Sequence, residues 1–232
     1  MILPFLILAG GTLLYGIVLS YLAALFLPPS QSQPGLGRKV FHIGIFTGAV
    51  PPQLLLGFWG VVVYGTVIAV LVLQGYLRGR GSLLYRTLAR SSDGDRHGRY
   101  VVLPLVATAM GGLASVLLVG EFAVVGYLVC GWGDAAGEMV GKRWGRRVYA
   151  LPLPWIEEGQ KRTVEGSLAV AGVGFLAAAM ALALLGEAPL SVLATGLACG
   201  VAGAGAEALS GHGTDNFWVQ LIPSLLGWWV LG

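Results

Sequence analysis

Asp134 and Glu138 stand four residues apart in the glycine-rich segment GDAAGEMVGKRWG. On a helix, this spacing places both carboxylates on one face. Mg²⁺ is commonly held by one or two carboxylates together with phosphate oxygens and water. Lys142 and Arg143, one turn further on, could bind those phosphates. The segment therefore predicts a metal-assisted phosphate site, and the alternative is an acidic helix end paired with neighbouring basic residues.

A second polar segment, KRTVEGS, begins at Lys161 and precedes a long apolar stretch. Thr163 can cap a helix that begins there, and the free N–H groups of a helix N-terminus favour an anion. Lys161 and Arg162 add positive charge at the same place. Glu165 could reach a metal ion or be an ordinary first-turn acid. Taken alone, the segment is also explained by a capped helix with a basic flank.

A third polar segment follows an Ala- and Gly-rich stretch near the C-terminus. Glu207 lies close to the end of that stretch, where a buried carboxylate is a candidate for function. Asp215 and Asn216 follow a Gly-rich turn and could contact a metal ion or a ribose. Helix capping is the alternative for both residues, and we expect His212 to be a loop residue.

The fourth segment, RKVFH, opens the second apolar stretch at Arg38. Arg38 and Lys39 are either topological charges or phosphate contacts. His42 lies one helical turn further on and could face the same site as a base or a phosphate contact. A buried structural histidine is the alternative. For His97 we expect a place in a solvated loop.

The elements that position these segments are strongly apolar. The chain has 232 residues, of which 56% are hydrophobic and 11% charged, against roughly 25% charged in soluble domains. The fourteen Lys and Arg residues fall in three windows, 38–39, 78–99 and 142–162. Such clustering is typical of the cytoplasmic loops of membrane proteins. The pattern predicts a single all-α, polytopic membrane domain with cytoplasmic basic loops, and it excludes a soluble nucleic-acid-binding domain.

A membrane-spanning helix needs about 20 apolar residues. Eight spans can be placed with both termini outside, and seven is the alternative because the short last span and the 36–77 pair are the weakest assignments. The predicted spans are 2–27, two crossings within 36–77, 100–119, 122–140, 167–185, 190–209 and 217–231. The 36–77 pair should turn near Gly57, with Pro51 and Pro52 kinking or shortening its first crossing. Residues 82–89 are expected to form an interfacial helix whose Leu83, Leu84, Tyr85 and Leu88 face lipid.

In chain order, the segments RKxxH, GDxxGExxGKRWG, KRTVEGS and ExxSxxGTDN resemble the membrane-embedded CTP-dependent polyprenol kinase family, which includes phytol and dolichol kinases. Three positions depart from the family pattern, since Ala135, Glu138 and Arg162 replace a Gly, an Asp and a Ser. The Arg could alter how the nucleotide fits. The resemblance extends more weakly to phosphatidate cytidylyltransferases.

The resemblance implies that a lipid alcohol such as phytol receives the γ-phosphate of CTP, or of another nucleoside triphosphate, with Mg²⁺ as cofactor. The implied catalytic residues are Asp134, Lys161, Glu165 and Glu207, and the implied Mg²⁺ ligands are Asp134, Glu138, Glu165 and Asp215. Nucleotide contacts are assigned to Arg38, Lys39, His42, Gly133, Gly137, Gly141, Lys142, Arg143, Arg162, Gly166, Ser167 and Asn216.

The expected partners are the lipid bilayer, the lipid alcohol and the nucleotide, with a homo-oligomer left open and nucleic acid excluded. The expected location is a bacterial-type inner membrane, with the active site on the cytoplasmic face. Two alternatives remain: CDP-lipid synthesis by a cytidylyltransferase, and an ion or solute transporter that uses Glu207 and Asp134 within the membrane. The position of the charges at one face argues against a transporter, whose sites tend to lie near the midplane.

Overall fold

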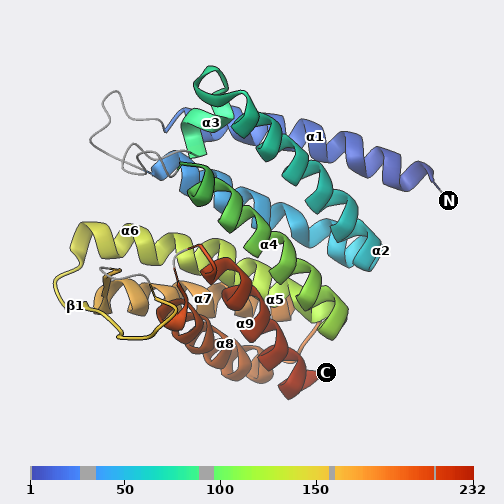
Figure 1. The fold of residues 1–232 in the computed structure, drawn as a ribbon. Coiled ribbons are helices and arrows are strands. Elements are labelled where there is room, and N and C mark those ends of the chain that lie inside the picture. Colours follow the sequence, from blue (N-terminus) through green and yellow to red (C-terminus); the bar gives the residue numbers. More distant parts are fainter. Residues whose placement is uncertain (1, 27–34, 89–96, 157–159, 212) are drawn as a thin grey trace.

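The computed structural model describes residues 2–26, 35–88, 97–156, 160–211 and 213–232. Within them the chain is all-α apart from one short two-stranded ribbon, and the long helices lie roughly along a common direction (Figure 1). The elements are α1 (Leu3–Ala24), α2 (Leu36–Leu77), η1 (Gly79–Gly81), α3 (Leu83–Leu88), α4 (His97–Val119), η3 (Gly120–Phe122), α5 (Ala123–Leu128), η4 (Val129–Asp134), α6 (Ala135–Trp144), β1 (Val148–Tyr149), β2 (Arg162–Thr163), α7 (Val164–Leu184), α8 (Pro189–Leu209) and α9 (Asp215–Leu231).

Two glycines reverse the chain between long helical legs. Gly57 has φ +58°, and α2 folds back there into a hairpin whose legs are joined by a 2.7 Å hydrogen bond from Tyr64 Oη to the carbonyl of Ile45. Gly120, also at φ +58°, reverses the chain between α4 and α5. Glycine adopts positive φ at little cost. The predicted turn at Gly57 is thus confirmed, and the first leg of α2 remains helical through Pro51 and Pro52.

Among the described residues, five helical stretches are long and apolar enough to cross a membrane. Two of them, of 42 and 44 residues, contain the glycine reversals, so the five stretches provide seven legs. The 17-residue α9 is the short final helix expected from the sequence. Large apolar side chains such as Leu55, Leu117 and Leu190 are exposed on the outside of the bundle. These features confirm an all-α polytopic membrane protein.

Some local predictions were wrong. Leu84 is only 5% exposed and packs against Gly75 of α2, so α3 turns this side chain inward rather than toward lipid. The backbone of His97 begins α4 instead of lying in a loop. The β1–β2 ribbon was not predicted, and it pairs Val148 with Thr163 and Tyr149 with Arg162. His212 and Ala89 lie outside the described residues.

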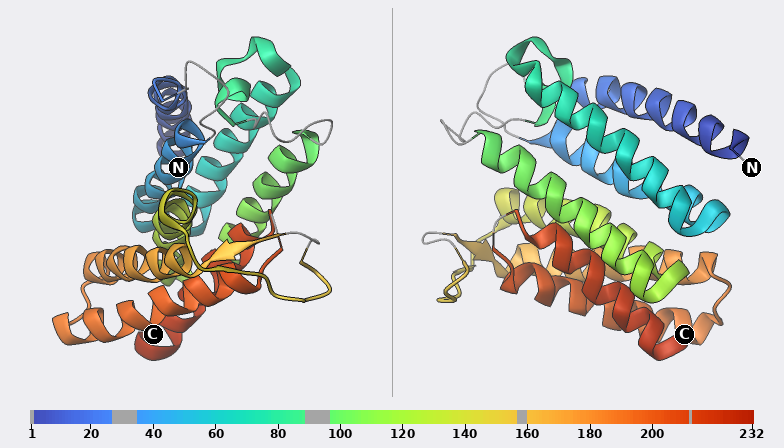
Figure 2. Two further views of the ribbon diagram at one scale, coloured as in Figure 1. Left: turned by 90° about the vertical axis from the view of Figure 1, so that its left-hand side faces the viewer. Right: turned by 45° about the vertical axis from the view of Figure 1, so that its right-hand side comes forward.

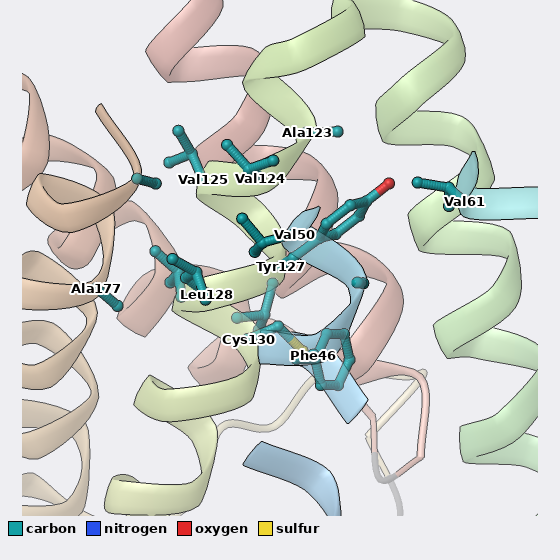
Figure 3. Packing of buried hydrophobic residues seen from close by; sticks show 14 of the residues in the cluster. Phe46, Val50, Val61, Ala123, Val124, Val125, Tyr127, Leu128, Cys130 and Ala177 are labelled. Atoms are coloured by element: carbon teal, nitrogen blue, oxygen red, sulfur yellow. The ribbon is translucent and has the colours of Figure 1, made fainter. Parts of the chain in front are cut away.

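The core is centred on α5, whose residues from Ala123 to Leu128 are all buried (Figure 3). The α5 helix contacts α2, α7 and α9, which lie around it in the bundle (Figure 2). Gly126 permits the tightest approach, since a Cβ atom at this position would lie 1.8 Å from the carbonyl oxygen of Gln220. Its amide donates to Ser224 Oγ at 3.1 Å. The backbone of α5 thus packs directly against α9, and this contact fixes the helices that carry the polar segments.

We expect Gly126→Ala to lower the free energy of unfolding by about 3 kcal/mol, because the added methyl group forces α5 away from α9. Thermal unfolding in detergent measures this change. Gly172→Ala is the matched control, since a Cβ there meets nothing within 4 Å, and it should be neutral or stabilise α7 by about 0.5–1 kcal/mol. Equal stability of the two variants would contradict the packing described for α5.

Candidate active site

Lys39 forms the centre of a charged cluster that joins the start of α2 to η4 and α6. The Lys39 side chain is buried, at 4% exposure, and its Nζ lies 2.9 Å from Asp134 Oδ2 and 2.7 Å from Glu138 Oε2. Arg38 Nη2 lies 2.5 Å from Glu138 Oε2, and Lys142 Nζ lies 2.5 Å from Glu138 Oε1. The fold thereby brings together residues 95 and 100 positions apart in the chain.

Asp134 is positioned by a local irregularity of the helix. Residues Val129–Asp134 form a π-helical turn, a feature that often occurs at functional sites. Glycines within and after this turn allow close packing: a Cβ at Gly131 would meet Phe46 at 2.5 Å, and a Cβ at Gly137 would meet Val170 at 2.3 Å. The Asp134 carboxylate is therefore fixed between α2 and α7.

The Lys161–Ser167 segment is held by a cap and an ion pair. Thr163 Oγ1 accepts a 3.1 Å hydrogen bond from the amide of Gly166, which confirms the predicted cap of α7. Arg162 forms an ion pair with Glu207 and donates to the carbonyl of Ser210 at 3.0 Å. Burial lowers the pKa of Arg162 from its ordinary value, and the Asp215 carboxylate opposes this shift. The Glu207 carboxylate is thus engaged by Arg162.

Asp215 and Asn216 lie at the start of α9 and connect the cluster to α4. Asp215 interacts electrostatically with Asp134, Arg162 and Lys39. Asn216 Nδ2 donates to Thr108 Oγ1 of α4 at 2.7 Å, and its side chain is buried. Thr108 carried no signal in the sequence, because an isolated threonine in an apolar stretch is ordinary. The arrangement makes Asn216 a positioning residue between two helices.

A cavity of about 580 Å³ runs through this region. One end is lined by charged side chains from four segments, namely Arg38, Lys39, Asp134, Glu138, Lys142, Lys161, Arg162, Glu207 and Asp215. His42, Gly137, Gly141, Gly166, Ser167 and Asn216 also line the cavity. The other end lies between α2 and α4 and is lined by apolar residues, including Phe46, Val61 and Tyr127 (Figure 3).

Three residues expected at the site do not line the cavity. Glu165 instead accepts hydrogen bonds from the backbone amides of Arg146 and Arg147, at 3.1 and 3.3 Å. Gly133 faces Val170 and Gly174 of α7, and the Arg143 guanidinium lies over the Trp144 ring at 5.2 Å. The structure therefore does not bring the Glu165 carboxylate to the other predicted ligands.

The charged end of the cavity offers carboxylate ligands for Mg²⁺, although the residues that the structure describes do not supply a complete set of protein ligands. Within the described ranges, no three His, Cys, Asp or Glu side chains converge as a complete metal cage. Asp134 and Glu138 nevertheless share Lys39 as a partner, so both carboxylates lie on one side of the cavity. Mg²⁺ typically takes only one or two carboxylates and completes its shell with phosphate oxygens and water. The pair fits that requirement.

The chain is 31% identical to the phytol kinase of Synechocystis sp. over 223 residues, which cover 92% of this chain and 89% of that protein. It is 27% identical to the dolichol kinase of Saccharomyces cerevisiae over 145 residues, covering 60% of this chain and 26% of that protein. No family model and no solved structure matches the chain. Because the similarity to phytol kinase extends over nearly the whole length of both proteins, the chain belongs to the polyprenol kinase family.

Proposed function

We propose that this protein is a membrane-embedded kinase that transfers the γ-phosphate of CTP to an isoprenoid alcohol such as phytol. The observation that carries the proposal is the cavity, which is charged at one end and apolar at the other. A kinase for such an alcohol must bring a triphosphate and a hydrocarbon chain to one point. Membership of the polyprenol kinase family supports this choice of reaction.

The basic side chains around the charged end would bind the triphosphate. Phosphoryl transfer depends mainly on positioning and charge neutralisation, with little covalent chemistry for the protein to perform. Arg38 and Lys39 approach from α2, Lys142 from α6, and Lys161 and Arg162 from the segment before α7. A triphosphate placed among them would contact cations from three sides. The positive-inside pattern favours the cytoplasmic face of an inner membrane for this site.

Asp134 and Glu138 would hold Mg²⁺, with Asp215 as the third nearby carboxylate. When bound there, the ion would neutralise charge on the phosphate oxygens. Lys39 keeps both carboxylates on the cavity side. Glu165 has a different role in this proposal, because its carboxylate joins the end of α6 to the start of α7. We therefore assign Glu165 to positioning of the basic segment.

The acceptor hydroxyl would lie beside Asp134 and His42, at the boundary between the two ends of the cavity. His42 Nε2 is 3.5 Å from Asp134 Oδ2, and its ring packs edge-on against Phe46, with ring centroids 4.7 Å apart. His42 thus touches the charged cluster on one side and the apolar lining on the other. Asp134 would accept the alcohol proton there, whereas Glu207 is occupied by Arg162.

We expect Glu165→Gln to reduce turnover by less than about tenfold. The Glu165 carboxylate does not line the cavity, and the variant changes its charge without removing its hydrogen-bond acceptor. The amide oxygen can still accept from the amides of Arg146 and Arg147. Initial rates of lipid phosphorylation at several Mg²⁺ concentrations check this. A loss of about 10³-fold that excess Mg²⁺ relieves would make Glu165 a metal ligand instead.

The proposed reaction is tested with purified protein, Mg²⁺ and two labelled forms of CTP. The proposal expects label from γ-labelled CTP, and none from α-labelled CTP, in a lipid monophosphate formed from phytol. ATP and UTP in parallel define the donor. Label from α-labelled CTP in a product made from a lipid phosphate would identify a cytidylyltransferase. Absence of lipid label with every donor and alcohol, from folded protein, would overturn the kinase proposal.

A further inference from the structure

The apolar end of the cavity has walls of two kinds. Its inner wall consists of buried side chains, including Phe46, Val61 and Tyr127. The two tyrosine hydroxyls at this end are already bonded to backbone, since Tyr64 Oη donates to the carbonyl of Ile45 and Tyr127 Oη donates to the carbonyl of Gly112. The aromatic rings therefore present hydrocarbon surface to the cavity. This end suits an apolar chain and offers little to a polar ligand.

The outer side of the apolar end lies between two neighbouring helical segments, namely α4 and the second leg of α2 (Figure 2). Gly65 and Thr66 on α2 and Ala109 on α4 line the cavity and are also exposed. A Cβ added at Gly65 would meet nothing within 4 Å. Exposure, small side chains and free space coincide at this place, so the cavity opens sideways here. In a membrane, that side faces the hydrocarbon interior.

The cavity is deep enough to span at least one leaflet. It is lined along α2 from Lys39 at the charged cluster to Ala49, and ten helical residues rise about 15 Å. The hydrocarbon core of a bilayer is about 30 Å thick. On the second leg the lining begins at Val61, four residues after the reversal at Gly57, so the cavity reaches from the membrane face that carries the cluster at least to the midplane. The tail of an alcohol that resides in this leaflet occupies the same range of depth.

We infer that the hydrocarbon tail of the lipid alcohol enters sideways from this leaflet, between the second leg of α2 and α4, and lies along the apolar end of the cavity. This inference rests on the proposed function. The opening at Gly65, Thr66 and Ala109 admits the chain, while the buried inner wall holds it with its hydroxyl toward His42 and Asp134. The protein thus binds long alcohols without removing them from the membrane into water.

A size series at Gly65 tests this inference. The variants Gly65→Ala, Gly65→Leu and Gly65→Phe fill the opening progressively, and the space around Gly65 lets each side chain be accommodated. For a C20 isoprenoid alcohol in nanodiscs, we expect KM to rise with side-chain size, by about tenfold or more for Phe. Geraniol, a short alcohol that can approach from the aqueous side, should be phosphorylated at an unchanged rate. Gly172→Phe, at another exposed glycine with free space around it, is the matched control and should behave as wild type.

The outcomes separate the inference from the proposed function. Wild-type kinetics for the C20 alcohol in folded Gly65→Phe would overturn the side entrance while leaving the kinase intact. An equal loss with geraniol and the C20 alcohol would also overturn it, because the substitution would then act on catalysis itself. Absence of phosphorylation by the wild type with either alcohol would instead contradict the proposed function. Thermal unfolding shows which variants are folded. If Gly65→Phe does not fold, the KM of Gly65→Leu for the C20 alcohol serves as the test.

Discussion

Asp134→Asn lowers the rate of phosphate transfer by about 10³-fold or more, because the variant loses both a proton acceptor and a charge beside the transferred phosphate. The amide keeps the shape of the carboxylate and can still accept from Lys39 Nζ, which lies 2.9 Å away. The fold should therefore survive the change. Initial rates at saturating CTP and alcohol measure the effect, with thermal unfolding as the check on structure.

Glu121→Gln is the matched control for this variant. Glu121 lies in η3, at the reversal between α4 and α5, and is not among the residues that line the cavity. Its substitution removes a carboxylate from the same chain without touching the site. We expect wild-type rates. A folded Asp134→Asn variant with turnover within about tenfold of wild type would remove Asp134 from the mechanism, since a proton acceptor contributes at least about 10²-fold.

The second large effect is expected at Lys39. Lys39→Met removes the buried cation between Asp134 and Glu138, so two carboxylates remain close together without their shared partner. Breaking a buried ion pair by removing one partner costs about 3 kcal/mol or more. We expect this loss in the free energy of unfolding, together with loss of phosphate transfer. Thermal unfolding and the labelled-CTP assay measure the two effects separately.

A double variant separates stability from chemistry at this position. Lys39→Met combined with Asp134→Asn removes the carboxylate that has lost its lysine partner, whereas Glu138 keeps Arg38 and Lys142, so the double variant should recover part of the stability. Activity should stay low, because both a phosphate contact and a proposed Mg²⁺ ligand are gone. Coupling of neighbouring charges produces non-additive effects of this kind. If Lys39→Met were as stable as wild type, Lys39 would not hold the cluster together.

Much of the site follows from local sequence patterns. The four-residue spacing of Asp134 and Glu138, the cap by Thr163 and the turn at Gly57 depend on residues close together in the chain, and local rules describe such features well. Which charged residues form ion pairs cannot be predicted by local rules, because Lys39 and Asp134 are 95 positions apart. Only the packed helices determine that they meet. The same holds for Glu207, whose partner Arg162 comes from the β2 strand.

The apolar end of the cavity could not be inferred from the sequence. In a soluble helix, apolar residues mark the buried face, whereas a membrane helix is apolar on all sides. Gly65 and Ala109 therefore look like many other small residues in the chain. Glu165 shows the opposite error, a predicted site residue that the structure places outside the cavity. Its position next to a basic segment suggested a metal ligand. In the structure it binds the backbone of Arg146 and Arg147.

The most direct test of the central claim is transfer of label from γ-labelled CTP to phytol, measured side by side for wild type and Asp134→Asn in nanodiscs. We predict a phytyl monophosphate that carries the label with the wild type and almost none with the variant, at equal folded protein. Equal labelling by the two proteins, or no labelled lipid with folded wild type, would contradict the assignment of this cavity as a lipid-alcohol kinase site.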